Sequence, residues 1–199
     1  MNHAFLVPGL AVGVLNWLAV EKKWKSVEYF TKPAVILLFL AWLWQNDLLG
    51  GAMIWFSLGL VFSLAGDIFL MLPGNFFIPG LVAFLLAHVM YLVGFNLSIT
   101  SISVPVLIAA LIFLGGTQLL YRRLARSLSE RKEDRLKLPI AVYTTVISLM
   151  AVSAMFTLAN PAWVPLHAII ATCGAVLFVI SDSLLAWNRF VAPVPHAAL

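Results

Sequence analysis

Two aspartates lie inside stretches of sequence that are otherwise typical of membrane spans. Asp67 lies in the apolar stretch 52–72, and Asp182 lies in the apolar stretch 165–187. An ionised carboxylate in hydrocarbon costs about 2.5–3.5 kcal/mol on insertion scales, so such residues usually serve a function. Two carboxylates at low dielectric suit acid–base chemistry, because one can hold a proton while the other stays ionised. The pair favours a reaction through an oxocarbenium ion, in which a proton is donated and water then attacks.

His88 and Tyr91 are candidates for the same site. They lie three residues apart in the apolar stretch 77–97, so on a helix they share one face. Each intramembrane polar residue also has a structural interpretation. An isolated aspartate can bond to a nearby hydroxyl, such as that of Ser63 or Ser181, and an isolated histidine is often a hydrogen-bonded core residue.

This sequence offers few of the side chains that usually bind a catalytic metal. Catalytic zinc usually takes three protein ligands rich in histidine, whereas Asp67, Asp182 and His88 offer a single imidazole. Cys173 is the only cysteine, which excludes a cysteine-based metal site. The sequence also lacks the Gly-x-Ser-x-Gly turn of serine hydrolases and the glycine-rich loops that hold phosphates. We therefore predict acid–base chemistry without a metal.

The elements that must hold these residues are transmembrane helices. Of 199 residues, 63% are hydrophobic and 10% are charged, whereas soluble domains carry about 25% charged residues. The mean hydropathy is +1.04, and no stretch shows the alternation of a β-barrel strand. We predict an all-α fold, a polytopic transmembrane helical bundle that forms one membrane domain over residues 1–199. The seven predicted spans are about 4–20, 33–49, 51–72, 77–97, 104–121, 139–159 and 165–187.

The basic residues predict the orientation of the bundle. All twelve Lys and Arg residues fall in segments 21–32 and 122–137 or at Arg189. With seven spans these places share one side of the membrane, which the positive-inside rule identifies as cytoplasmic, with the N-terminus outside. The net charge of +4 arises beside the membrane, so it favours contact with anionic membrane lipids and not with nucleic acid.

This topology predicts that the two aspartates lie at similar depth. The spans 51–72 and 165–187 run in the same direction, and each aspartate lies five residues before the inner end of its span. At 1.5 Å per residue, both carboxylates are expected roughly 7–8 Å from the inner ends of their helices. His88 is expected nearer the middle of the membrane, on a helix that runs the other way.

Four runs of the sequence resemble the lysoplasmalogenase, or YhhN-like, family of multi-pass membrane enzymes. They are YFTKPAVILL (29–38), FSLAGDIFLML (62–72), FIPGLVAFLLAHVMYLVGF (77–95) and GAVLFVISDSLLAWNRF (174–190). The most specific features are a Gly-Asp late in one span, an Ala-His-x-x-Tyr in the next and a Ser-Asp-Ser late in the chain. The family as we know it has eight spans, so either the sequence stops before the last helix or this member lacks that helix.

The resemblance implies hydrolysis of the vinyl ether bond of lysoplasmalogens to a fatty aldehyde and glycerophosphoethanolamine or glycerophosphocholine. This reaction needs an acid and a stabilised cation, and no metal or organic cofactor. The implied catalytic residues are Asp67 and Asp182, whose order as acid and base stays open, and His88, which would position water or orient a carboxylate. The expected contacts of the lysophospholipid come from Lys32 at its phosphate, Tyr91, Ser181 and Tyr143.

Other interpretations stay open at this point. Lys32 lies where a lysine also reaches the membrane interface simply to keep its ammonium hydrated. The buried aspartates and histidine would also suit the proton relay of a proton-coupled transporter, or a lipid-binding membrane protein. Short loops favour a bacterial inner membrane, and the sequence gives no oligomeric state.

Overall fold

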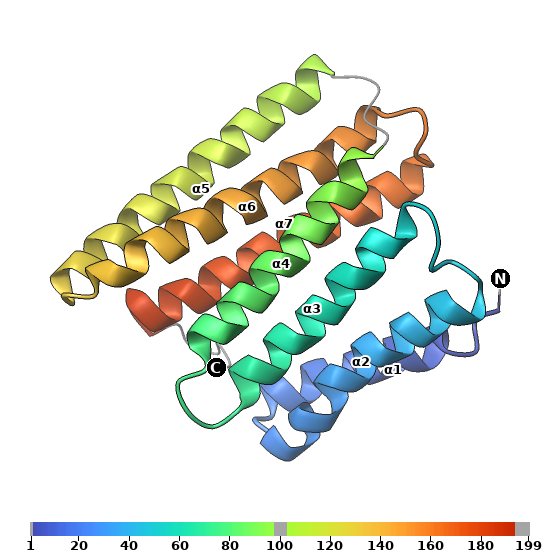
Figure 1. Cartoon of the computed structure of the whole chain (residues 1–199), viewed down its shortest axis with the longest axis horizontal. Helices are drawn as coiled ribbons and strands as arrows, with labels where there is room; N and C mark the ends of the chain where they lie inside the picture. The colour runs from blue at the N-terminus through green and yellow to red at the C-terminus, as the bar shows by residue number, and fades with distance from the viewer. Residues whose placement is uncertain (1, 98–102, 194–199) are drawn as a thin grey trace. The chain divides into compact units, whose positions relative to one another are not determined.

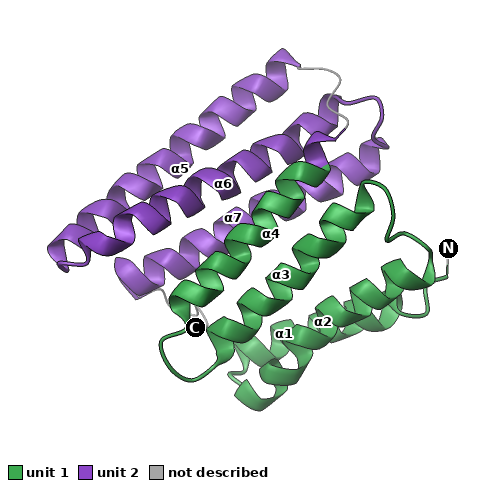
Figure 2. Cartoon of the chain, in the orientation of Figure 1, with its two compact units in different colours: residues 1–94, 198 green, residues 95–197, 199 purple. Residues whose placement is uncertain are grey.

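The computed structural model describes residues 2–97 and 103–193, and over these residues it is helical with no strand (Figure 1). The described residues form two compact units, with residues 2–94 in unit 1 and the remainder in unit 2 (Figure 2). The helices are α1 (Leu6–Glu21), α2 (Lys25–Gln45), α3 (Met53–Met71), α4 (Phe77–Asn96), α5 (Val104–Glu130), α6 (Lys137–Phe156) and α7 (Pro165–Phe190). Two short 3₁₀ helices, η1 (Asp134–Leu136) and η2 (Thr157–Ala159), flank α6.

The all-α membrane fold is confirmed. Six of the described helices are long and apolar enough to cross a membrane. The helix α1 has 16 residues, which gives it a length of about 24 Å at 1.5 Å per residue. That is less than the roughly 30 Å of hydrocarbon in a bilayer, so the seventh span stays a prediction. The orientation of the N-terminus and the single domain over residues 1–199 also stay predictions.

Two helices extend by eight or nine residues beyond the spans predicted for them. The helix α2 begins at Lys25 rather than at residue 33, and α5 continues to Glu130 rather than ending near residue 121. Apolar length predicts how much of a helix lies in hydrocarbon, whereas Lys, Arg and Glu are themselves good helix formers. The 27 residues of α5 span about 40 Å, so part of this helix extends beyond the hydrocarbon.

Large apolar side chains on the outer faces of the helices fit this membrane assignment. Ile112 and Leu119 on α5 are 72% and 66% exposed, and Leu177 on α7 is 65% exposed. Water-soluble proteins rarely expose a continuous apolar patch of this kind. The chain is therefore an integral membrane protein.

Within unit 1, α3 and α4 approach closely because glycines leave room for large side chains. A Cβ atom on Gly59 would lie 2.2 Å from the Tyr91 ring, and one on Gly80 would lie 2.8 Å from the Leu70 side chain. Small residues at such positions are typical of packed membrane helices, where dispersion contacts drive association. Gly59 therefore determines where the Tyr91 ring sits against α3.

Gly59→Ala is expected to lower the free energy of unfolding by about 1–3 kcal/mol, the usual cost of forcing extra volume into a packed site. The matched control is Gly174→Ala on α7, because a Cβ there meets nothing within 4 Å. The control should leave stability unchanged or raise it by about 0.5–1 kcal/mol, since alanine favours helix over glycine. Thermal unfolding in detergent measures both variants, and equal stability of the two would contradict the packing role of Gly59.

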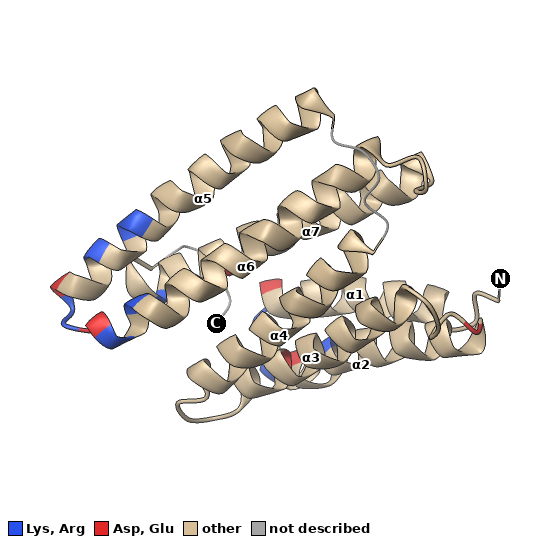
Figure 3. Ribbon diagram, turned by 45° about the horizontal axis from the view of Figure 1, so that its top comes forward, with Lys and Arg blue, Asp and Glu red and all other residues tan. Residues whose placement is uncertain are grey.

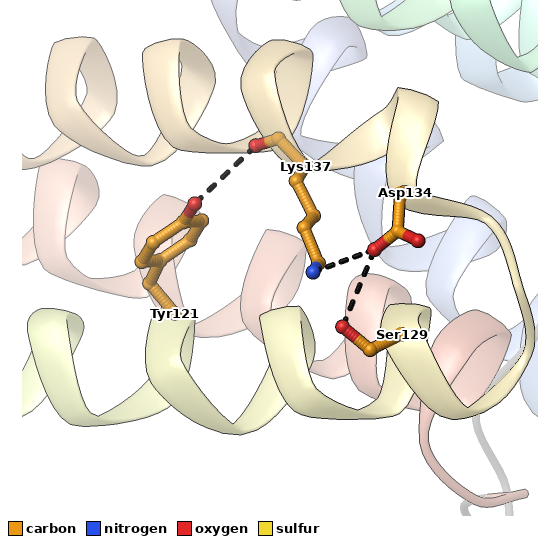
Figure 4. A network of polar contacts seen from close by, with 4 residues as sticks. All are labelled: Tyr121, Ser129, Asp134 and Lys137. Atoms are coloured by element: carbon orange, nitrogen blue, oxygen red, sulfur yellow. Dashed lines mark hydrogen bonds and ion pairs between the residues drawn. The ribbon is translucent and has the colours of Figure 1, made fainter.

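Charged residues of unit 2 gather at the turn between α5 and α6 (Figure 3). The ammonium of Lys137 lies 2.6 Å from an Asp134 carboxylate oxygen, to which the Ser129 hydroxyl also donates a hydrogen bond of 3.3 Å (Figure 4). Nearby, the Ser127 hydroxyl donates to the carbonyl of Phe190 at 2.5 Å. These contacts tie the end of α5 to the start of α6 and the end of α7.

Candidate functional site

Asp67 forms an ion pair inside unit 1. The Lys32 ammonium of α2 lies 3.1 Å from an Asp67 carboxylate oxygen of α3. The Lys32 side chain is 32% exposed and the Asp67 side chain is 16% exposed. An ammonium at this distance favours the ionised form of the carboxyl group, and it offsets part of the cost of placing that charge in an apolar segment.

The face of α3 that carries Asp67 also carries other polar contacts. Gly59, Ser63 and Asp67 are spaced four residues apart and therefore share one side of the helix. The Ser63 and Tyr91 hydroxyls lie 3.2 Å apart in a hydrogen bond. Near the end of α3, the Tyr29 hydroxyl donates a hydrogen bond to the carbonyl of Met71. This side of α3 thus bonds with α2 at one end and with α4 at the other.

His88 lies next to Tyr91 on α4 and is fully buried. The centroids of the two rings are 6.4 Å apart, and their planes are inclined by 55°. Asp67 also acts electrostatically on the Tyr91 phenol. The structure therefore brings four of the predicted site residues into unit 1, from three helices: Lys32, Asp67, His88 and Tyr91.

Asp182 lies in unit 2 and has its own hydrogen-bonding partner. The Tyr143 hydroxyl of α6 donates to a carboxylate oxygen of Asp182 on α7. Tyr143 is buried, with 8% of its surface exposed, whereas Ser181 is exposed. Ser181 is the neighbour of Asp182 along α7, but a step of one residue turns a helical side chain by about 100°. Tyr143 therefore holds the Asp182 carboxylate by a hydrogen bond. Ser181 is exposed, whereas Tyr143 is buried.

The predicted residues are thus divided between the two units. Asp67 and Asp182 belong to different units, so their joint action on one substrate stays a prediction. Two contributing residues were not predicted as parts of a site, namely Tyr29 and Ser63. The four-residue spacing of Gly59, Ser63 and Asp67 is a signal in the sequence that pointed to Ser63. Nothing local marked Tyr29, because its partner is a backbone carbonyl on another helix.

The groups near each carboxylate are ones that can donate protons or hydrogen bonds. Asp67 has an ammonium as its partner, Asp182 has a phenol, and a second phenol and an imidazole lie in unit 1. Across the described residues, no three His, Cys, Asp or Glu side chains gather as metal ligands would. The groups that are present can hold a carboxylate in position and exchange protons with it.

Comparisons with known proteins agree on one family. The YhhN family matches residues 27–199 of this chain. The human lysoplasmalogenase TMEM86B is 30% identical over 185 residues, which cover 93% of this chain and 69% of the human protein. The mouse lysoplasmalogenase TMEM86B is 30% identical over 187 residues, covering 93% and 73%, and the human lysoplasmalogenase TMEM86A is 33% identical over 144 residues, covering 70% and 55%. No solved structure matches the chain.

Proposed function

Since the chain belongs to the YhhN family, we propose that it is a lysoplasmalogenase. It hydrolyses the vinyl ether bond of a lysoplasmenyl lipid, and the products are a fatty aldehyde and glycerophosphoethanolamine or glycerophosphocholine. The observation that carries the proposal is the similarity to the human protein of that name, at 30% identity over 93% of this chain.

The chemistry of the bond supports the same assignment. An acid protonates the β-carbon of the vinyl ether, which leaves an oxocarbenium ion at the α-carbon. Water adds to this cation and loses a proton, and the resulting hemiacetal collapses to the aldehyde and the free glycerol hydroxyl. One proton is consumed and one is released, so the sum is the addition of one water molecule. A carboxylic acid and a carboxylate are the groups this sequence of steps needs.

The proposed catalytic residues are Asp67 and Asp182, with His88 positioning water or orienting a carboxylate. Asp67 is supported by the ammonium, phenol and imidazole that accompany it in unit 1, and Asp182 by the phenol of Tyr143. Lys32, with a third of its side chain exposed, binds the substrate phosphate. The substrate enters from the leaflet that the basic segments face, which we propose is the cytoplasmic leaflet of a bacterial inner membrane.

Aldehyde release by the purified full-length protein tests this proposal directly. The protein is incubated with a lysoplasmenylethanolamine in detergent, with and without a chelator, and the aldehyde is quantified as its hydrazone. We expect aldehyde to form at the same rate in both samples. Proton-coupled uptake of a solute into proteoliposomes without any aldehyde would instead favour a transporter. The saturated ether analogue of the lipid is the negative control, because it lacks the vinyl group.

Tyr143→Phe is expected to lower kcat about 10- to 100-fold while changing KM little. The substitution removes a hydrogen bond to a carboxylate, which is worth about 1.5–3 kcal/mol, but retains the aromatic ring. Its matched control is Tyr121→Phe, which removes a weak 3.5 Å bond to the carbonyl of Lys137 in the same unit. Steady-state kinetics measure both variants, and an unchanged kcat for Tyr143→Phe would show that Asp182 does not depend on this phenol.

A further inference from the structure

Lys32 would contact two anionic groups, the Asp67 carboxylate and the phosphate of the substrate. Its ammonium lies 3.1 Å from the Asp67 carboxylate in the structure, whereas the proposed function assigns it to the phosphate of the substrate. If the Lys32 ammonium pairs with the phosphate, it no longer pairs with the Asp67 carboxylate. The two roles are thus consecutive states of one side chain, and the change between them alters the charge balance around Asp67.

The geometry allows this change without a shift of the helices. The Tyr29 hydroxyl donates to the carbonyl of Met71 one turn away from the Lys32–Asp67 pair, and this bond holds α2 on α3. The Lys32 side chain is twice as exposed as that of Asp67, 32% against 16%. Its flexible four-carbon stem can therefore swing the ammonium outward while both backbones stay in place.

Electrostatics then determines what happens at Asp67. The Lys32–Asp67 pair is neutral, so a phosphodiester that joins it brings the local charge to −1 when the head-group cation, on the side of the phosphate away from the glycerol, stays in water. Uncompensated charge is costly in an apolar segment. A phosphodiester is a much stronger acid than a carboxylic acid, so a compensating proton goes to the carboxylate and not to the phosphate. The final state pairs the ammonium with the phosphate and leaves a neutral carboxylic acid.

We propose that Lys32 passes from Asp67 to the phosphate of the lipid and that Asp67 then takes up one proton from water. Binding of the head group thereby converts Asp67 into the acid that protonates the vinyl ether. The idea rests on the proposed function, and it deepens it by assigning Asp67 as the acid. The proton taken up at binding is transferred to the β-carbon, and the attacking water later returns one proton to solution.

Other titratable groups near Asp67 are compatible with this change. From α4, the Tyr91 phenol lies within electrostatic reach and the imidazole of His88 lies beside it. From α2, Lys32 is the cation paired with Asp67. The phenol can donate a hydrogen bond to Ser63 whether Asp67 is charged or neutral, so it does not compete for the proton.

A hydrophobic carbodiimide tests the proposal without any turnover, because it reacts with a protonated carboxyl group in preference to a carboxylate. The purified protein is labelled alone, with 1-O-alkyl-glycerophosphoethanolamine, and with 1-O-alkyl-glycerol, which lacks the phosphate. Neither ether can be hydrolysed. Mass spectrometry then quantifies the adduct at Asp67. We expect several-fold more labelling with the phosphate-bearing ether than with the other two samples.

Lys32→Met and Lys32→Arg complete the test. Lys32→Met should label strongly at Asp67 in all three samples, because no ammonium keeps the carboxyl group ionised. Lys32→Arg should keep the dependence on phosphate, since the guanidinium retains the charge. With alkenyl substrates, Lys32→Met should also lose the preference in kcat/KM for the phosphate-bearing lipid over the alkenyl glycerol.

The outcomes separate this inference from the proposed function. Equilibrium dialysis shows whether the phosphate-bearing ether is bound. If it is bound but does not increase labelling of Asp67, the inference is overturned, even if the protein releases aldehyde. Labelling that responds as expected in a protein that releases no aldehyde would support the exchange of Lys32 and overturn the hydrolase assignment. Failure of the phosphate-bearing ether to bind would overturn the inference, whereas the hydrolase assignment depends on aldehyde release alone.

Discussion

Asp67→Asn is expected to reduce aldehyde release from a lysoplasmenyl lipid by about 10²–10⁴-fold, the usual contribution of a general acid or base. The amide keeps the shape of the carboxyl group, but it can neither supply a proton to the vinyl ether nor accept one. The loss should appear mainly in kcat, because Lys32 can still bind the phosphate when Asp67 no longer competes for its ammonium. Initial rates of aldehyde formation measure it.

The matched control for this change is Asp47→Asn. Asp47 lies in the exposed connection between α2 and α3 and adopts a left-handed backbone with φ of 53°, which asparagine also tolerates. The same chemical change in the same unit should therefore leave activity and stability unaltered. Turnover of Asp67→Asn close to that of the wild type would remove Asp67 from the mechanism.

Asp67→Asn also leaves the Lys32 ammonium without its carboxylate, so a loss of folded protein must be distinguished from a loss of chemistry. Removing one partner of a partly buried ion pair destabilises a protein because the remaining charge is uncompensated. Thermal unfolding in detergent resolves this point. Asp67→Glu offers a second variant that retains the charge and displaces it by one methylene, and we expect it to fold normally and to recover part of the activity.

The membrane fold followed from the sequence because hydrocarbon imposes a simple rule on the backbone. Every polar backbone group must be satisfied inside the span, so a long apolar run with no strand-like alternation has to be a helix. The limits of the helices were harder to predict. The helix α2 begins in the basic segment that was expected to precede the span, since a helix does not need to end where the hydrocarbon does.

The site residues were predictable by type, whereas their partners were not. An aspartate in an apolar span is costly wherever it lies, so Asp67 and Asp182 stand out in the sequence alone. The pairing of Lys32 with Asp67 depends on how α2 and α3 align along their length, which is fixed by contacts such as the bond from Tyr29 to the Met71 carbonyl. Periodicity within one helix carries no information about that alignment.

Asp182→Asn is expected to cause a loss as large as that of Asp67→Asn, again about 10²–10⁴-fold in kcat. Its carboxylate is held by the Tyr143 phenol, so the amide would keep a hydrogen-bonding partner but lose the charge that stabilises a cation or activates water. The control is Asp134→Asn, which removes an exposed ion pair with Lys137 in the same unit and should cost little. If Asp182→Asn turned over substrate as fast as the wild type, Asp182 would have a structural role and no catalytic one.

The double variant Asp67→Asn/Asp182→Asn shows whether the two aspartates serve one reaction. Residues that act as a unit in one turnover give losses that are strongly non-additive, because the first substitution already removes most of what the second could remove. We therefore expect the double variant to be no more than slightly slower than the poorer single variant. Losses that multiply would instead mean that the carboxylates of the two units contribute independently to turnover, which would contradict their joint action as one acid–base pair.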